Sequence, residues 1–429
     1  MKKKNLYAIL LLASVSLFNV SCKKEISNSQ PKEDKRKLII ANNSNSTIKQ
    51  MNNKKINVSN VAELYDAVNT SANEGSEIDL AEGTYILDAS YPNAGRIELQ
   101  HDMTLRGQQG HPEAVVIDAS GLPDASFNPP LNFPAKRTGA IRMGRGSNTI
   151  EWVKIIGNNH AQALSVIDTD LIGDGISYIR IAHTIITGGR IGVNLRNVGP
   201  ASVNRVIEAE IMDNELTGNL VSDPGTQQGQ GLVMQNANGA TGAVIRATLN
   251  GNNVHGNIIG MRLFNNNGNP NTHNDNSSIS IQSNADRFDD NKLGIYIVGG
   301  SNAGANSTVN GNLVSFEAHG TSIQNNQGIL PDPITHPCGI HLIGGSNRLA
   351  GSSASNNIVE MRLAGCTISG NQGSDIISYG AFSTTSTLAG TNNVVNIYLT
   401  GVSANATVAT PVGSVPTEPA GTNVVNLYR

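Results

Sequence analysis

Residues 244–263 read VIRATLNGNNVHGNIIGMRL, and this stretch decides the fold. Apolar and polar residues alternate from Val244 to Leu249, which is the two-residue period of a β-strand with one buried face. A second alternating segment, Gly260 to Leu263, follows the motif Val254-His255-Gly256-Asn257. Each alternating segment is about 4–6 residues long, which is too short for an ordinary helix. The stretch therefore predicts short strands joined by tight turns.

The four-residue motif returns along the chain as an apolar residue, a variable residue, a small or polar residue and then Asn. Successive copies end 31, 30, 38, 34, 35 and 45 residues apart. Self-similarity at a spacing of ~20–50 residues is typical of a stacked repeat. One copy carries Gly in place of Asn, and the full set is Ile155–Asn158, Ile186–Gly189, Leu216–Asn219, Val254–Asn257, Phe288–Asn291, Ile323–Asn326 and Ile368–Asn371.

A single coil of short strands cannot bury its apolar face alone, so the coils are expected to stack on one another. An Asn at one fixed place in every coil would then form a ladder of side-chain amides along the stack. Asn also tolerates the left-handed backbone conformation that tight turns require.

These coils resemble the right-handed parallel β-helix of the pectin lyase-like superfamily, over roughly residues 56–429. The resemblance implies an all-β solenoid forming one domain. It implies no single activity, because that fold hosts many functions. Ahead of the coils, residues 60–68 predict a short capping helix, in which Asn60 caps the first turn together with Glu63. The helix is expected to cover the open end of the stack.

The N-terminus predicts a targeting segment. Three lysines precede an apolar run, Leu6 to Val15, which is too short to span a membrane. The following Ser21-Cys22 resembles a bacterial lipoprotein signal, so residues 1–21 are expected to be removed and Cys22 lipidated; a plain secretory signal is the alternative. Lys23 favours the outer membrane, on its periplasmic or cell-surface side. Residues 22–55 are polar and basic and predict a flexible tether.

Charge excludes one class of partner. Residues 1–60 hold 12 Lys/Arg and 3 Asp/Glu, whereas the rest of the chain holds 18 and 30, which gives a body with a net charge of −12. The body has no basic stripe of the kind that nucleic-acid binding requires. The two cysteines of the body, Cys338 and Cys366, permit a disulfide, but Cys366 is more typical of a small buried hydrophobic residue.

A trough is predicted where the repeat is interrupted. Two coils keep a three-residue link from the motif's Asn to the next Gly, at Asn257 to Gly260 and Asn291 to Gly294. The coils on either side carry insertions at the same turn, Leu220 to Gln230 and Gln327 to Cys338. If the coils are in register, these insertions form two walls around a concave site of the kind that binds ligands.

The floor of this trough predicts a polysaccharide site. Thr217, His255, Asp289 and Gln324 are expected to stack before the turn, and Asn194, Val233, Arg262, Tyr296 and His341 after it. His255 and Asp289 are the candidate catalytic residues, because they can move protons. Arg262 and Lys292, with Tyr296 and His341, are the candidate substrate-binding residues and suit a uronate carboxylate. Asp289 with Asp290 is a candidate Ca²⁺ site, since that ion takes carboxylate oxygens.

The sequence thus predicts a lipid-anchored protein that binds polysaccharide, and it leaves open whether the protein also cleaves the polymer as a lyase or glycoside hydrolase. The alternative is a non-catalytic structural or adhesive protein of the cell envelope, in which the trough residues are solvated surface. The polygalacturonase motifs are absent apart from one Asp-Asp, and the Ca²⁺ and Arg pattern of pectate lyases is not matched. Glu317 and His319 form a weaker candidate pair. The chain has a single Trp, Trp152, which is few for a sugar-stacking surface.

Overall fold

The computed structural model describes residues 54–123, 139–158, 165–169, 175–220, 229–328, 338–349, 351–382, 390–408 and 422–429. The chain divides into two units, Met1–Gln50 and Met51–Arg429, and every described residue belongs to the second. The predicted signal peptide, Cys22 and nearly all of the predicted tether lie outside the described residues. In the part that is described, no helix is long and apolar enough to cross a membrane.

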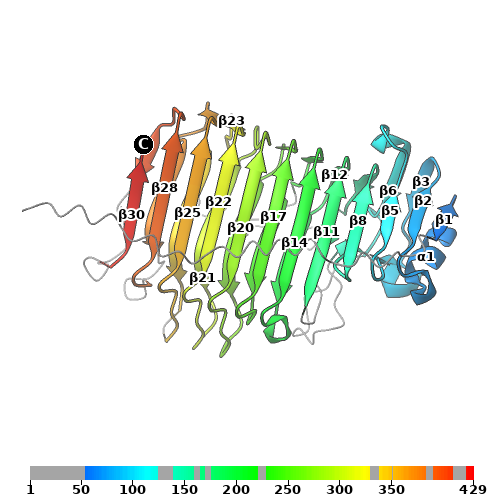
Figure 1. The fold of residues 1–429 in the computed structure, drawn as a ribbon, viewed down its shortest axis with the longest axis horizontal. Coiled ribbons are helices and arrows are strands. Elements are labelled where there is room, and N and C mark those ends of the chain that lie inside the picture. Colours follow the sequence, from blue (N-terminus) through cyan, green and yellow to red (C-terminus); the bar gives the residue numbers. More distant parts are fainter. Residues whose placement is uncertain are drawn as a thin grey trace, which may run out of the picture. The chain divides into compact units, whose positions relative to one another are not determined.

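Three parallel sheets, here named A, B and C, build the second unit, and successive coils add one strand at a time to each. Figure 1 shows the strands of sheet A side by side, from blue β1 to red β30. Within the described ranges, sheet A has twelve strands. They are β1 (Lys55–Val58), β2 (Glu77–Leu80), β5 (Thr104–Arg106), β8 (Ser147–Glu151), β11 (Ile176–Ala182), β14 (Val206–Met212), β17 (Val244–Asn250), β20 (Ser278–Asn284), β22 (Leu313–His319), β25 (Ile358–Ala364), β28 (Val394–Thr400) and β30 (Val424–Tyr428).

Sheet B is formed by the three-residue and four-residue strands that follow sheet A in each coil. Its described strands are β3 (Gly83–Ile86), β6 (Val115–Asp118), β9 (Lys154–Ile156), β12 (Ile185–Thr187), β15 (Glu215–Thr217) and β18 (Asn253–His255), continued by the pair β23 (Ser322–Gln324) and β26 (Thr367–Ser369). Single bridges from Arg287 to Asn253 and to Ser322 join the two parts.

Sheet C is the third wall of the coil. Its described strands are β4 (Ile97–Glu98), β7 (Gly139–Arg142), β10 (Ser165–Asp168), β13 (Ile191–Val198), β16 (Gln230–Ala237), β19 (Ile259–Asn267), β21 (Leu293–Asn302), β24 (Ile340–Asn347), β27 (Ile376–Phe382) and β29 (Ala406–Val408). Four short 3₁₀ turns lie in the described connections, at Ser71–Asn73, Pro92–Gly95, Pro112–Ala114 and Pro200–Ser202.

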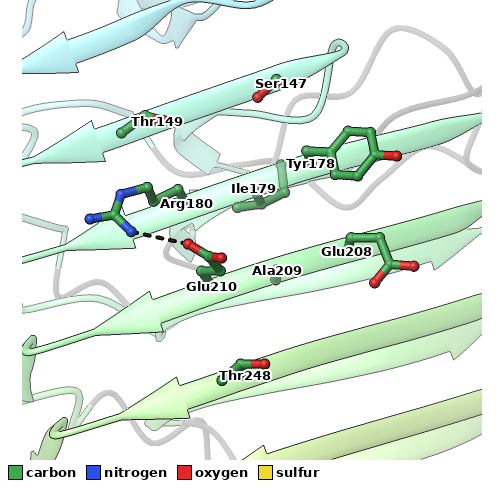
Figure 2. Close-up of a pocket in the computed structure, with 9 residues that line it drawn as sticks. All are labelled: Ser147, Thr149, Tyr178, Ile179, Arg180, Glu208, Ala209, Glu210 and Thr248. Carbon is green, nitrogen blue, oxygen red and sulfur yellow. Dashed lines mark hydrogen bonds and ion pairs between the residues drawn. The ribbon is translucent and has the colours of Figure 1, made fainter. Parts of the chain in front are cut away.

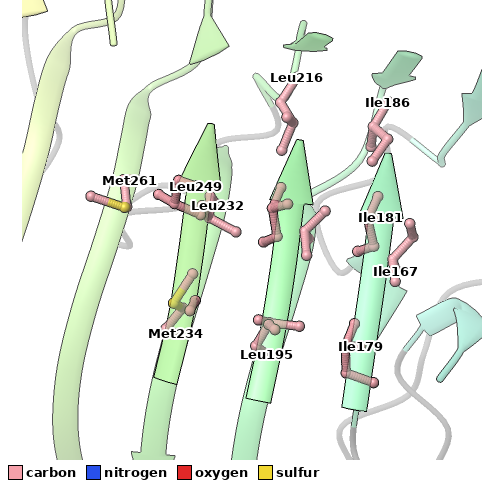
Figure 3. Packing of buried hydrophobic residues seen from close by; sticks show 14 of the residues in the cluster. Ile167, Ile179, Ile181, Ile186, Leu195, Leu216, Leu232, Met234, Leu249 and Met261 are labelled. Carbon is pink, nitrogen blue, oxygen red and sulfur yellow. The ribbon is translucent and has the colours of Figure 1, made fainter. Parts of the chain in front are cut away.

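The apolar core lies between the three sheets, where like residues stack from coil to coil. Ile211 of β14 pairs with Ile181 of β11 and Leu249 of β17, and all three are fully buried. Figure 3 shows these aliphatic layers, with Ile186 and Leu216 contributed by sheet B. Burying one such side chain contributes about 1.5–3 kcal/mol, so the repeated layers stabilise the stack along its length.

The predicted Asn ladder is present. The backbone N–H and the side-chain Nδ2 of Asn219 donate to Oδ1 of Asn257 at 3.2 and 2.9 Å. Asn257 donates in the same way to Asn291 at 3.0 and 3.1 Å. Asn326 continues the ladder to Asn371 at 3.0 and 2.9 Å. Each turn therefore satisfies its buried polar groups through the turn of the next coil.

A second ladder runs along the corner between sheets A and B, where the sequence did not predict one. Asn214 donates to Asn252 through its backbone and side chain at 3.1 and 2.9 Å. Asn252 donates in turn to Oδ1 of Asp286 at 2.8 and 2.7 Å. Ser283 closes this ladder by donating its hydroxyl to Oδ2 of Asp286 at 2.6 Å.

The predicted capping helix is α1 (Val61–Asn69). The Glu63 N–H donates to Asn60 Oδ1 at 3.0 Å, and the Ser59 N–H donates to Glu63 Oε2 at 2.8 Å. Leu64 and Val68 are fully buried in the core. The predicted fold class, an all-β parallel solenoid with a short N-terminal helix, is confirmed by these pairings.

Both cysteines of the body are free and buried. Cys366 lies in the turn between β25 and β26 rather than within a strand. Burial raises the pKa of the Cys338 and Cys366 thiols above their ordinary values. Both residues therefore pack as small apolar groups.

Candidate functional site

The residues predicted to stack before the turn are in register. Thr217 pairs with His255 across β15 and β18. Arg287 bridges Asn253 and Ser322, which places Asp289, two residues later, in line with His255 and Gln324. The Gln324 N–H donates to Asp289 Oδ1 at 2.7 Å, which confirms the alignment.

The contacts of Asp289 differ from those of a free catalytic carboxylate. Asp289 is only 3% exposed. The Ser322 hydroxyl lies 2.9 and 3.0 Å from its two oxygens, and the Arg287 Nε donates to Oδ2 at 3.1 Å. His255 instead lies with its Nε2 3.1 Å from Glu215 Oε1. Between these described side chains no hydrogen bond joins His255 to Asp289, so their joint catalytic role stays a prediction.

The donor set around Asp289 does not fit Ca²⁺. Both of its oxygens already accept hydrogen bonds from N–H or O–H groups. Asp290 adopts a left-handed conformation with φ 55° in the turn. Among the described residues, no group of three or more His, Cys, Asp or Glu side chains is gathered closely enough to hold a metal ion. We therefore derive no metal chemistry from this pair.

The row predicted to follow the turn is also in register, on the outer face of sheet C. Strand pairing aligns Asn194, Val233, Arg262, Tyr296 and His341. The period-2 pattern was therefore right about which residues point away from the solenoid core.

This row is nevertheless buried rather than open. His341 is 0% exposed, and its ring centroid lies 5.3 Å from that of Tyr296, which is also buried. The Arg262 guanidinium lies 4.0 Å from the centre of the Phe264 ring and 5.3 Å from that of Tyr296. These rings belong to a second, smaller apolar cluster on this face. Lys292 is partly buried in the same turn.

Most of the two insertions predicted to form walls, 221–228 and 329–337, lies outside the described residues. The trough itself is therefore not visible, and the substrate-binding roles of Arg262, Lys292, Tyr296 and His341 stay predictions.

Earlier coils place charged residues in the same row of sheet C. Glu98, Arg142 and Asp168 align on β4, β7 and β10 and are all largely buried. Asp168 pairs with Arg196 through two contacts, Oδ2 to Nη2 at 2.8 Å and Oδ1 to Nε at 3.0 Å. Glu98 pairs with Arg145. The sequence missed this cluster because each residue occurs once, on a different strand, without a shared motif.

An open groove of about 500 Å³ lies on the outer face of sheet A (Figure 2). It crosses the strands β8, β11, β14 and β17. The residues that line it are Ser147, Thr149, Tyr178, Ile179, Arg180, Glu208, Ala209, Glu210 and Thr248.

Two adjacent rows of outward side chains form the groove. Strand register aligns Ser147, Tyr178 and Glu208 in one row. The Tyr178 ring is exposed, at 52% for the residue. The second row carries an ion pair between Arg180 Nη1 and Glu210 Oε2 at 3.0 Å, drawn as the dashed line in Figure 2.

Neighbouring charges fix the groove's side chains in place. Arg180 Nε lies 4.0 Å from Glu151 Oε2, and Glu208 pairs with Arg246 of β17. These are partly exposed ion pairs, which contribute little to stability individually. They place carboxylate and guanidinium groups in the same groove as the half-exposed Tyr178 ring.

No sequence motif indicates this groove. Most of its residues are ordinary outward positions of four strands separated by about one repeat each. The signal that would have found it is an aromatic residue at an outward position, in register with a charged residue of the next coil. Glu317 and His319, the weaker candidates, lie on the same face of sheet A, where His319 Nε2 is 3.1 Å from Glu317 Oε1.

Comparison with known proteins assigns the chain to no family. No family model matches the chain, and no curated protein matches it. The mannuronan C-5 epimerase AlgE4 A-module of Azotobacter vinelandii is 14% identical, with 84% of this chain and 100% of that chain covered and a TM-score of 0.32.

Two further solved structures match at a similar level. Pectate lyase Pel9A is 14% identical, over 87% of this chain and 82% of that chain, with a TM-score of 0.34. XylC in complex with xylose is 11% identical, over 87% and 86%, with a TM-score of 0.34. At these scores the fold rests on the strand pairings of the chain itself, and any site rests on its own geometry.

Proposed function

We propose that this protein binds a polysaccharide in the groove on the outer face of sheet A. The observation that carries the proposal is the half-exposed Tyr178 ring in the same groove as the Arg180–Glu210 ion pair. A sugar ring has an apolar C–H face that packs against an aromatic ring, and hydroxyls that hydrogen-bond to charged groups. The groove offers both kinds of contact, together with the hydroxyls of Ser147 and Thr149.

We propose binding without cleavage at this groove. Glycoside hydrolysis needs two carboxyl groups with different tasks, one of them a proton donor with a raised pKa. The two carboxylates here, Glu208 and Glu210, are each paired with an arginine. Cleavage by His255 and Asp289 remains the alternative, and it would act on sheets B and C rather than here.

The test is the affinity of purified protein for soluble polymers, measured by affinity electrophoresis and calorimetry. The panel contains xylan, galactomannan, chitosan, alginate and polygalacturonate. We expect at least one polymer to bind, and Tyr178→Ala to weaken that binding by about tenfold or more, which corresponds to loss of one stacking contact. Tyr398→Ala is the matched control, because Tyr398 lies on the same face of sheet A at β28. No binding to any polymer, or equal loss in both variants, would overturn the proposal.

We further propose that Cys22 carries the lipid that anchors the protein at the outer membrane. The support is the sequence alone: the charged start, the short apolar run and Ser21-Cys22-Lys23. A labelled fatty acid should be incorporated into the native protein and not into Cys22→Ala, and the variant should leave the membrane fraction. Equal labelling of both proteins would exclude lipidation at this residue.

A further inference from the structure

The three strands that build the groove continue into a corner that carries an aromatic cluster. Register places Trp152, His183 and Asp213 at equal positions, directly after β8, β11 and β14. The ladder of backbone bonds runs through them: the Trp152 N–H donates to Ala182 O at 3.2 Å, and the His183 N–H donates to Met212 O at 2.9 Å. The three side chains therefore stack one over another, as the strands do.

The cluster is ordered by direct contacts. The Trp152 and His183 rings are parallel, with centroids 3.9 Å apart and planes inclined by 12°. His183 Nδ1 lies 3.6 Å from Asp213 Oδ2. The His183 side chain is 26% exposed and that of Asp213 is 51% exposed, so the cluster reaches the surface.

The backbone at this corner suits a residue without a side chain. Trp152, His183 and Asp213 have φ of 60°, 54° and 50°, in the left-handed region that Asp and His adopt more readily than most residues but that a bulky Trp rarely adopts. Later coils place Gly251, Ala285, Gly320, Gly365 and Gly401 at the same position. Gly therefore satisfies the backbone at this position, whereas a Trp in the same conformation costs free energy. Such strain is retained where the side chain has a function.

The corner lies at the end of three of the strands that line the groove. His183, directly after β11, follows Tyr178 by five residues, a distance of about 17 Å for an extended strand. Ala182, the outward residue just before the corner, is small and buried. No large side chain of β11 thus separates the groove from the aromatic cluster.

We propose that the polysaccharide-binding groove extends along β8, β11 and β14 to this corner, where Trp152 forms a second stacking position for a sugar ring. The bound chain then runs along the strand direction, from Tyr178 of one coil to Trp152 of the neighbouring coil. This inference rests on the proposed function of the groove. It predicts that affinity rises with ligand length until the ligand spans both aromatic residues, because the second contact is made at high effective concentration.

The sole Trp gives a direct readout of this corner. Xylan-derived and alginate-derived oligosaccharides, from disaccharide to hexasaccharide, are titrated into the full protein while Trp152 emission and binding heat are recorded. Hexasaccharides of the class that binds should change the emission, whereas disaccharides, held at Tyr178, should not. Trp152→Gly carries the residue that later coils use, so its Tm should be equal or higher, while its affinity for the hexasaccharide falls by about tenfold.

The outcomes separate the two proposals. If the hexasaccharide binds Trp152→Gly as tightly as the native protein, but binds Tyr178→Ala weakly, the extension to the corner is wrong and the groove remains. If neither oligosaccharides nor polymers bind the native protein, both proposals fall. Tyr398→Ala again serves as the control and should bind like the native protein.

Discussion

At the scale of single residues, the carboxylate of Asp289, a candidate catalytic group, makes hydrogen bonds that join its own coil to the next one. Its two oxygens accept from Ser322, Gln324 and Arg287, all of which lie in its own coil or the next one. By accepting these hydrogen bonds, the carboxylate keeps the turns of two consecutive coils in register. The same burial that removes it from solvent makes it costly to delete.

We therefore predict that Asp289→Ala destabilises the fold. The variant leaves the Gln324 N–H without its acceptor, which costs about 1–3 kcal/mol of the free energy of unfolding. Urea denaturation followed by circular dichroism measures this. Asp290→Asn is the control and should change stability by less than about 0.5 kcal/mol, because Asn tolerates the left-handed conformation of that exposed position. Equal stability of Asp289→Ala and the native protein would contradict the structural role and reopen the catalytic one.

At the scale of elements, the corner ladder between sheets A and B ends in the carboxylate of Asp286, although an amide oxygen could accept the same hydrogen bonds. Asn214 and Asn252 occupy the equivalent positions in earlier coils, and Asp286 accepts from Asn252. Burial raises the pKa of the Asp286 carboxyl, opposed by hydrogen bonds from Ser283 and Asn252. Asp286 therefore makes the hydrogen bonds of the ladder, but its burial disfavours the charged form of the carboxyl.

The sign of the pH dependence follows from that shift. An acid with a higher pKa in the folded state binds more protons when folded, so the free energy of unfolding falls as pH rises from the unfolded value of about 3.9 to the folded pKa. Asp286→Asn removes this contribution and should be more stable than the native protein above that window. Thermal unfolding at acidic and neutral pH measures the difference. A stability gain of the same size on both sides of the window would contradict the explanation.

The strands and the first Asn ladder could be predicted from the sequence, because the same residue pattern returns in each successive coil. The helix α1 followed from Asn60 and Glu63, and the ladder from Asn219 to Asn371 followed from one motif. The second ladder was missed because its members are not one residue type: Asn214 and Asn252 are amides and Asp286 is an acid.

At the scale of the whole molecule, the alternation of apolar and polar residues predicts which face of a sheet a side chain points to. It does not predict whether that face is covered by other residues or exposed to solvent. Tyr296 and His341 point away from the core, as predicted, but Tyr296 is buried in a second apolar cluster and His341 is buried against its ring. Tyr178 also points away from the core, and it is exposed in the groove that Arg180 and Glu210 line. The alternation pattern treats these cases alike, so the sequence placed the candidate site on sheet C and overlooked the groove on sheet A.

The central claim, that the groove on sheet A binds the sugar chain, is tested most directly by a crystal structure of the protein with a bound hexasaccharide. The account predicts sugar rings packed on Tyr178 and contacting Arg180 and Glu210 on the outer face of sheet A. Sugar density along Arg262, Tyr296 and His341 on sheet C, with sheet A bare, would contradict it.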